Sequence, residues 1–267
     1  MNIRGKTIWI TGASAGIGKA TAIEFAKRGA KTLILSARNE RKLTAVKLEI
    51  ENATDCKCLV FPLDLSETKD LEQQTSGLLA SIGKIDCLFN NGGISQRANG
   101  SETAIEVDRR IMEVNFFGTI ALTKIVLKNM IANGGGNIIV TSSLTGKFGF
   151  PLRTAYAASK HALHGYFESL QFEEAPNDVY VTMICPGRIK TDISVNALTK
   201  DGKPWSKSDE GQEKGMKVSD CAGVIADAVE KNKKEIVIGS FGEKMMVKIK
   251  RFNPSLFRWL VPKISHT

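Results

Sequence analysis

The chain has 267 residues and a net charge of +9; 42% of its residues are hydrophobic, 24% are charged and 7 are proline. This composition is that of a globular protein and excludes disordered, collagen-like and coiled-coil chains, and the length favours a single α/β or barrel unit. The sequence has no run of about 18 uncharged apolar residues and no leading hydrophobic segment after Met1, so we expect a cytoplasmic protein.

Short apolar runs alternate along the chain with longer amphipathic stretches, a pattern typical of repeated βαβ units. The runs that predict strands are Lys6–Thr11, Lys31–Ser36, Lys57–Leu63, Ile85–Asn90, Asn137–Ser143, Val179–Cys185 and Glu235–Gly239. Several are continuous in hydrophobicity, as strands buried on both faces are. Residues 1–267 are therefore expected to form one α/β domain, a doubly wound Rossmann fold with a seven-stranded parallel sheet flanked by helices.

Two segments depart from this pattern. Residues 188–216 are polar and lack periodicity, and a loop of that length in a compact domain is typical of a substrate lid or of a disordered stretch. Residues 241–267 hold six basic residues and one acidic residue, which is +5 of the net +9. Met245, Ile249 and Phe252 there share one helical face, and a second apolar stretch follows the break at Asn253–Pro254. Two short basic amphipathic helices of this kind suit a membrane surface or a groove on a partner subunit, and docking on the chain's own core fits equally.

The cysteines and histidines form no recognisable disulfide or metal pattern. Of five cysteines, only Cys56 and Cys58 are close in sequence, and free, mostly buried thiols are expected. His161, His164 and His266 lie in no zinc-binding motif, so no metal site is expected.

A glycine-rich turn follows the first expected strand and reads TGASAGIG at residues 11–18. Three glycines in such a place allow a tight turn, close approach of backbone N–H groups to a pyrophosphate, and close packing of the next helix. The amino end of that helix adds partial positive charge. Any tight βα turn uses glycine, but between a strand and a helix of a βαβ unit the motif predicts dinucleotide binding.

The end of the second expected strand reads Ser36-Ala37-Arg38, where NAD-binding folds usually carry a carboxylate for the ribose hydroxyls. A carboxylate repels a 2′-phosphate, whereas a guanidinium binds it through paired charge-assisted hydrogen bonds. Arg38 therefore favours NADP over NAD. The alternative is that Arg38 only begins the charged helix that follows or stacks on the adenine.

Tyr156 and Lys160 stand four residues apart at the start of an apolar-periodic stretch, so in a helix they would share a face. An ammonium about 4 Å from the phenol, at an effective dielectric constant of about 20, contributes roughly 4 kcal/mol toward phenolate, or about three pH units from a tyrosine pKa of about 10. Such a tyrosine would exchange protons near neutral pH. The same spacing also arises when an exposed lysine lies beside a packed ring.

Taken in order, these motifs resemble those of the short-chain dehydrogenase/reductase family in its single-domain form. The matching features are TGxxxGxG at 11–18, Asp64, NNGG at 90–93, Asn115, Ser143, Tyr156 with Lys160, and Pro186-Gly187 with Thr191. One departure is Gly92, where the family usually has alanine, and a glycine loosens the backbone beside the cofactor slightly.

The resemblance implies a catalytic tetrad. Tyr156 would act as general acid or base, Ser143 would hydrogen-bond the same substrate oxygen, and Ser142 is the neighbouring alternative. Lys160 would lower the pKa of the tyrosine and bind the nicotinamide ribose, and Asn115 would hold a water in the proton relay.

The resemblance also implies a set of cofactor contacts. These are Gly12, Ser14, Ala15, Gly16, Ile17, Gly18, Arg38, Asp64, Leu65, Asn91, Gly92, Tyr156, Lys160, Pro186, Gly187 and Thr191. Asp64 would accept from the adenine amino group or cap a helix, and Asn90 would lie along the adenosine ribose or brace the sheet.

The function expected from these residues is an NADP-dependent oxidoreductase that transfers a hydride between nicotinamide and the carbonyl or secondary alcohol of an apolar small molecule. The alternative is a non-catalytic nucleotide-binding or membrane-surface protein, which would be expected to have lost the tyrosine, lysine or serine.

A homodimer or homotetramer is expected. Nucleic acid is not an expected partner, because the basic residues gather with apolar ones at 241–267. The phrase NPSLF at 253–257 resembles the carboxyl ends of hydroxysteroid-dehydrogenase-like members of the family, which implies weak peripheral membrane contact and help in closing the substrate site.

Overall fold

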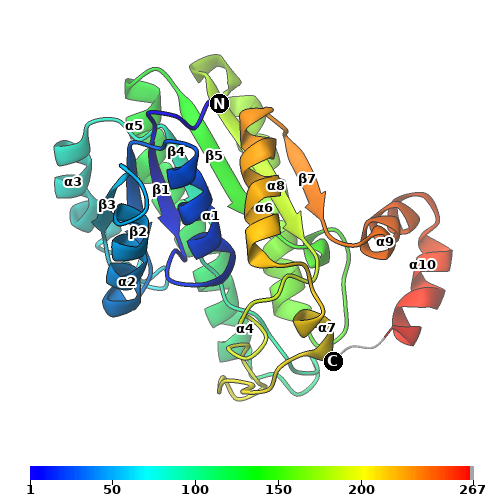
Figure 1. Cartoon of the computed structure of the whole chain (residues 1–267). Helices are drawn as coiled ribbons and strands as arrows, with labels where there is room; N and C mark the ends of the chain where they lie inside the picture. The colour runs from blue at the N-terminus through cyan, green and yellow to red at the C-terminus, as the bar shows by residue number, and fades with distance from the viewer. Residues whose placement is uncertain (265–267) are drawn as a thin grey trace.

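A single parallel sheet of seven strands forms the centre of the computed structural model, which describes residues 1–264 (Figure 1). Its order is β3-β2-β1-β4-β5-β6-β7. The strands are β1 (Thr7–Thr11), β2 (Thr32–Ser36), β3 (Lys57–Val60), β4 (Cys87–Asn90), β5 (Gly136–Thr141), β6 (Val179–Pro186) and β7 (Glu235–Ile238). The predicted doubly wound Rossmann sheet is confirmed. Its order reverses between β1 and β4, and ligands of such sheets bind in the crevice at this reversal, outside the carboxyl ends of the strands.

Some strands are shorter than the sequence predicts. β3 ends at Val60 and not at Leu63, although the N–H groups of Phe61 and Leu63 still donate to the carbonyls of Leu35 and Ala37. β5 ends at Thr141, so Ser143 lies beyond the strand.

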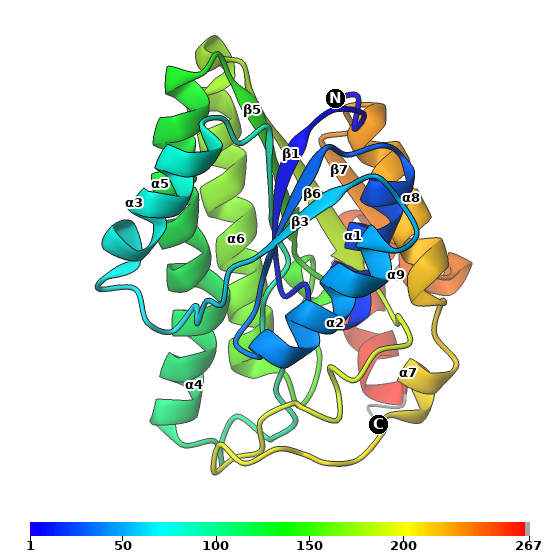
Figure 2. The same cartoon turned by 60° about the vertical axis from the view of Figure 1, so that its left-hand side comes forward.

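Helices cover both faces of the sheet (Figure 2). One face is covered by α1 (Gly16–Lys27), α2 (Glu40–Glu51) and α8 (Val218–Glu230), and the other by α3 (Leu71–Ile82), α5 (Gly118–Ala132) and α6 (Thr154–Glu173). The helix α4 (Ile105–Met112) passes into α5 through the π-helical turn η1 (Glu113–Phe117). Fully buried aromatic residues fill both interfaces, with Phe25 and Phe89 on the first face and Trp9 and Phe167 on the second.

All five cysteines are free and buried, as predicted. Within residues 1–264, no group of acidic, cysteine and histidine side chains is arranged to hold a metal ion. None of the helices in this described part of the chain has the length and apolarity that crossing a bilayer requires.

The long loop at 188–216 packs against the body of the domain. A bridge between Ile189 and Met216 closes its two ends, and it contains the short helix α7 (Glu210–Glu213). Leu198 is buried, and its backbone pairs with Ser95 and Arg97 of the segment after β4. The loop is therefore an ordered excursion over the carboxyl end of the sheet.

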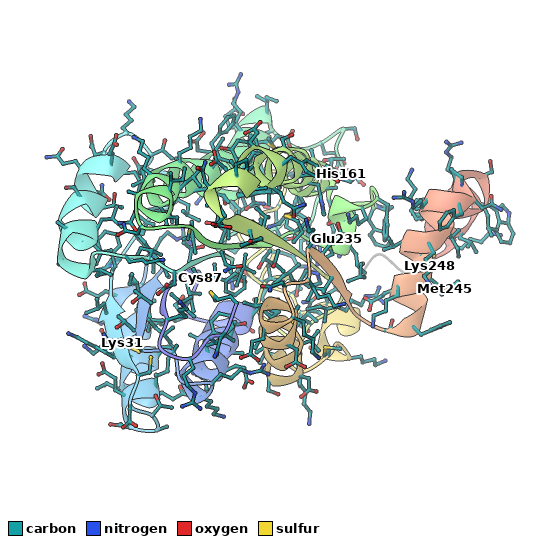
Figure 3. All side chains as sticks on the ribbon, turned by 90° about the horizontal axis from the view of Figure 1, so that it is seen from above. Lys31, Cys87, His161, Glu235, Met245 and Lys248 are labelled. Atoms are coloured by element: carbon teal, nitrogen blue, oxygen red, sulfur yellow. The ribbon has the colours of Figure 1, made fainter. Side chains whose placement is uncertain are left out.

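The tail forms two helices beside the β7 edge, as Figures 1 and 3 show. These are α9 (Phe241–Phe252) and α10 (Pro254–Leu260), followed by the 3-10 turn η4 (Val261–Lys263). The predicted break at Asn253–Pro254 is confirmed: the Asn253 side chain accepts a hydrogen bond of 3.0 Å from the Leu256 N–H, and Pro254 opens α10. Residues 265–267, including His266, lie outside the described residues.

The inner side of the tail packs on the domain's own core. Phe257 and Val261 are buried against Leu144 and Phe148, and the rings of Phe148 and Phe257 lie 5.0 Å apart. Of the apolar residues predicted on one face of α9, Ile249 packs on this cluster, whereas Phe252 is 80% exposed. The tail thus combines a docked face with an exposed aromatic one.

Candidate active site

The glycine-rich turn between β1 and α1 has the geometry that a phosphate-binding loop requires. Gly12 and Gly16 have φ of +66° and +55°, a region that side chains rarely adopt. A Cβ at Gly18 would come 2.3 Å from the Gly12 carbonyl oxygen, so only glycine allows α1 to approach the turn this closely. Among the described residues no side chain caps the amino end of α1, which leaves its first N–H groups available to an anion. The turn therefore fits the pyrophosphate of a dinucleotide; Ser14, Ala15 and Ile17 complete it.

Thr11 ties this turn to the loop after β4. Its Oγ1 accepts hydrogen bonds of 3.0 Å from the N–H groups of both Asn91 and Gly92, a role that the sequence did not reveal. The Asn91 amide donates back to the Thr11 carbonyl at 3.2 Å. A Cβ at Gly92 would lie 2.8 Å from Leu65 Cδ1, so Leu65 occupies the space of the alanine that the family usually has. The backbone at Gly92 is thus held by hydrogen bonds and by packing.

Two side chains near the adenosine end of this crevice are engaged within the protein. Asp64 accepts hydrogen bonds from the N–H and the hydroxyl of Ser66, at 3.0 and 2.8 Å. Its predicted use as a helix cap was wrong, because α3 begins only at Leu71. Asn90 donates to Thr123 of α5 at 2.9 Å, which matches the bracing alternative.

Arg38 follows β2 and its guanidinium is exposed. Asn39, the next residue, caps α2 by accepting from the Lys42 N–H at 3.0 Å. In the part of the chain that the structure describes, Arg38 forms no ion pair. Its charge is therefore available at the carboxyl end of β2.

Tyr156 lies in the first turn of α6, and this turn is fixed by the fully buried Gln96. The Gln96 Oε1 accepts from the backbone N–H groups of Ala155 and Tyr156, at 2.9 and 3.4 Å. These donors are among the unpaired N–H groups at the helix start, so Gln96 acts as a cap supplied from a distant loop. Sequence reasoning missed this residue because its partner is about 60 positions away.

The surroundings of the Tyr156 hydroxyl differ from the sequence-based expectation. Burial raises the pKa of Tyr156, and the hydrogen bond with Ser143 and the positive charges of Arg153 and Arg97 oppose this rise. Lys160 Nζ lies 5.7 Å from the centre of the Tyr156 ring and donates to the Thr141 carbonyl at 2.7 Å, and its predicted effect on the phenol stays a prediction. Burial lowers the pKa of Lys160 to about 8. The two residues share a face of α6, as the spacing predicts.

The two neighbouring serines point in different directions. Ser143 caps the 3-10 turn η2 (Leu144–Gly146), accepts from the Thr145 hydroxyl at 3.0 Å and acts to lower the pKa of Tyr156. Ser142 is buried behind the site, 2.9 Å from His164 Nε2, and donates to the Lys160 carbonyl at 3.3 Å. Of the two serines, Ser143 is thus the one that acts on Tyr156, and it is also the one selected from the sequence.

Asn115 occupies the π-helical turn η1, a local distortion that is frequent at functional sites. Its amide accepts from the Ile94 N–H at 2.8 Å, donates to the Ile94 carbonyl at 2.9 Å and donates to Ser159 at 3.0 Å. A Cβ at Gly93 would lie 3.0 Å from Asn115 Oδ1 and 3.6 Å from Lys160 Nζ, so both side chains converge on Gly93. Water binding by Asn115 stays a prediction.

The loop after β6 closes the cofactor side of the crevice. Gly187, next to Pro186, donates to the Ile238 carbonyl at 2.7 Å, and the Thr191 methyl carbon lies 3.2 Å from where a Cβ of Gly16 would be. Glu243 of α9 accepts from the Arg188 N–H at 2.8 Å. The tail therefore holds the same loop that covers the glycine-rich turn.

The fold and the clustered residues define a nicotinamide-dependent oxidoreductase, and comparison with known proteins gives its family. The family model described as "short chain dehydrogenase" matches residues 6–202, and the chain belongs to this family. A "Dehydrogenase/reductase SDR family protein 7-like" of Drosophila melanogaster is 38% identical over 262 residues, which cover 97% of this chain and 80% of the relative. A "Dehydrogenase/reductase SDR family member 7B" of Rattus norvegicus is 38% identical over 261 residues, which cover 96% of this chain and 80% of the relative.

Solved structures share the fold. A short-chain dehydrogenase/reductase from Burkholderia phymatum in complex with NAD superposes with a TM-score of 0.84 at 22% identity, covering 96% of each chain. A short chain dehydrogenase from Burkholderia cenocepacia in complex with NADP has a TM-score of 0.80 at 22% identity, covering 98% of this chain and 99% of the other. The two complexes hold different cofactors, so the shared fold does not distinguish NADP from NAD.

Proposed function

We propose that the chain transfers a hydride between NADP(H) and the carbonyl or secondary alcohol of an apolar small molecule. The observation that carries this proposal is the buried Tyr156 hydroxyl, whose pKa Ser143 acts to lower, on the helix face that also holds Lys160 beside the glycine-lined crevice. A non-catalytic nucleotide-binding protein would have no use for a phenol held in this way. The crevice and tyrosine together support an enzyme.

The bound nicotinamide would supply or accept the hydride. Tyr156 would give its proton to the substrate oxygen in the reducing direction and take it back in the oxidising one. Ser143, which acts to lower the pKa of Tyr156, would hold that oxygen by a hydrogen bond. Burial keeps the pKa of Tyr156 high, so the phenol is protonated at neutral pH, which is the form that carbonyl reduction requires.

Lys160 and Asn115 would act around this pair. The Lys160 ammonium, next to Gly93 at the crevice, would bind the nicotinamide ribose, and moving from the Thr141 carbonyl toward the phenol would bring its charge to bear on Tyr156. Asn115 would position the Ile94 segment and a relay water.

NADP is proposed over NAD because Arg38 offers an unpaired guanidinium where a carboxylate would serve the ribose hydroxyls of NAD. Gly12, Gly16, Gly18 and the other residues of the predicted cofactor set would hold the rest of the dinucleotide along the crevice.

An apolar substrate is proposed because aromatic side chains gather beside the tetrad. Leu144 follows Ser143 directly, and it packs with Phe148 and Phe257 of the tail. We further propose that loop 188–216 and the tail close this side of the site, and that the exposed Phe241, Phe252 and Trp259 with the surrounding basic residues make weak contact with anionic membranes. Figure 3 shows Met245 and Lys248 on α9, at the end of the molecule formed by the tail. A homo-oligomer and a cytoplasmic location stay predictions.

The experiment that tests the function follows NADPH absorbance with a panel of ketones, aldehydes and steroid-like alcohols. Tyr156→Phe should lower turnover of an accepted substrate by a factor of about 100 or more and leave cofactor affinity nearly unchanged, because only the hydroxyl is removed. Tyr180→Phe is the matched control, since the Tyr180 ring is half exposed near the start of β6 and its hydroxyl donates to Asp178. Retention of more than a few per cent of activity in Tyr156→Phe would show that another group transfers the proton.

A further inference from the structure

A buried cluster of charged residues lies beside Tyr156. Arg97 comes from the segment after β4, Arg153 precedes the first residue of α6, and Asp209 belongs to the loop 188–216. One carboxylate oxygen of Asp209 accepts from both guanidiniums, at 3.0 Å from Arg97 and 3.3 Å from Arg153. The three side chains are only 4%, 12% and 7% exposed, in the order Arg97, Arg153, Asp209.

Among the side chains that the structure describes, the positive charge of this cluster exceeds its negative charge. Two guanidiniums share a single carboxylate, and the other bonds of Arg97 and Arg153 go to neutral groups: the Ser95 hydroxyl and the backbone carbonyls of Gln96 and Pro151. Arg97 and Arg188 act to lower the pKa of Arg153, whereas Asp209 raises it. Burial makes the largest contribution and lowers this pKa to about 10. A buried cation without an equal counter-charge is costly, so its presence next to a reacting group calls for an anion.

The cluster lies near the start of α6, which carries the reacting hydroxyl. The charges of both Arg153 and Arg97 act on the Tyr156 phenol, and Gln96, next to Arg97, caps the turn that carries Tyr156. The Arg153 guanidinium also lies 5.2 Å from the centre of the Phe150 ring, which packs on the apolar cluster of Leu144 and Phe257. A cationic group thus lies near both the proton donor and an apolar surface.

We propose that Arg153, supported by Arg97, recognises an anionic group of the substrate, a carboxylate or a phosphate, located close to the carbonyl or alcohol on which Tyr156 acts. A guanidinium binds both groups through paired hydrogen bonds. The substrate is then amphipathic, with its anionic end at Arg153 and its apolar part along Phe150 and Leu144. Asp209 neutralises one of the two arginines and competes with the substrate anion for them. This proposal rests on the proposed function, since it assigns the substrate of the same site.

Equilibrium binding tests the proposal without turnover. Octanoate, octyl phosphate and 1-octanol would be titrated calorimetrically into the full chain, with and without NADP⁺. Octanoate or octyl phosphate should bind at least about tenfold more tightly than octanol, and which of the two anions binds better separates a carboxylate from a phosphate site. Arg153→Gln should lower the affinity for the preferred anion by about 10- to 100-fold and change octanol binding little. Arg110→Gln, an exposed arginine on α4, is the matched control and should have no effect.

A second variant separates recognition from a purely structural salt bridge. Asp209→Asn removes the competing carboxylate, so it should raise the affinity for the anion. If the cluster only fastens the loop to the domain, the variant should bind the anion more weakly than the wild type or equally well. Two results would overturn the proposal. One is equal affinity for octanoate, octyl phosphate and octanol, and the other is no effect of either Arg153→Gln or Asp209→Asn on anion binding. Anion binding with these responses but no activity on any carbonyl compound would instead count against the proposed function.

Discussion

Replacing the buried Lys160 by methionine should make the free protein more stable at neutral pH while it removes activity. Burial lowers the pKa of Lys160 from its ordinary value of 10.5 to about 8, so at pH 7 the buried, charged ammonium destabilises the folded state. At about 1.4 kcal/mol per pH unit this costs roughly 3 kcal/mol. Methionine has a similar length and carries no charge, but it loses the bond to the Thr141 carbonyl, worth about 1 kcal/mol. The expected net gain at pH 7 is therefore about 2 kcal/mol.

The sign of the pH dependence follows from proton binding. Below about pH 8 the lysine is protonated in both the folded and unfolded states, so the full cost is present. Between pH 8 and 10.5 only the unfolded state holds the proton, and the stability of the wild type therefore rises relative to the variant. The advantage of Lys160→Met should disappear by about pH 10.

Urea unfolding of both proteins at several pH values between 7 and 10 measures this difference, because effects of pH on all other groups cancel between them. Lys128→Met is a suitable control, since Lys128 is 72% exposed and pairs with Glu72 only at the surface. If Lys160→Met were less stable than the wild type at pH 7, or if the gap did not vary with pH, the lysine would not be a stability cost and the reasoning from burial would fail.

Three further predictions concern the cofactor crevice and the tail. Arg38→Asp should reduce the preference for NADPH over NADH by at least about tenfold in a fluorescence titration, with Arg41→Asp on α2 as control; an unchanged preference would mean that Arg38 does not meet the 2′-phosphate. Gly18→Ala should abolish cofactor binding, because its Cβ would meet the Gly12 carbonyl oxygen at 2.3 Å, whereas Gly223→Ala on α8, with nothing within 4 Å, should bind normally and gain up to about 1 kcal/mol in stability. Phe252→Ser with Trp259→Ser should weaken co-sedimentation with anionic vesicles at low salt, and Phe172→Ser, equally exposed on α6, should not; a wild type that never sediments refutes membrane contact.

The order of strands and the glycine-rich turn could be predicted because they depend on local signals. Continuous apolar runs such as Ile8 to Ile10 are typical of strands buried on both faces, and Gly12, Gly16 and Gly18 mark a turn whose geometry favours glycine. The relation of Tyr156 to Lys160 was half predicted. Their shared helix face follows from the spacing, but the position of the ammonium depends on where β5 ends, and Thr141 is brought to it only by the tertiary fold.

Contacts between distant segments could not be predicted from one sequence. Gln96 is an ordinary polar residue in sequence, and its value as the cap of α6 arises only when the segment after β4 lies against the helix start. Asp209 likewise gives no local signal, because its two arginine partners are 56 and 112 positions away. For the tail, the sequence shows which side chains are apolar, and helical spacing shows which of them share a face. It does not show which face packs on the domain, and Phe257 and Phe252 are distinguished only by the docking surface at Phe148.

The tail and the loop after β6 behave as one unit at the cofactor side of the crevice. Glu243 forms a capping box with Ser240 at the start of α9, and the same carboxylate accepts from the Arg188 N–H. A Cβ at Gly187 would come 2.6 Å from this carboxylate, so glycine is needed where the tail helix meets the loop. From this point the loop runs over Gly16 at Thr191 and on to Asp209 beside the tetrad. Through Glu243 the tail helix α9 thus contacts the loop that borders both the cofactor turn and the arginine cluster.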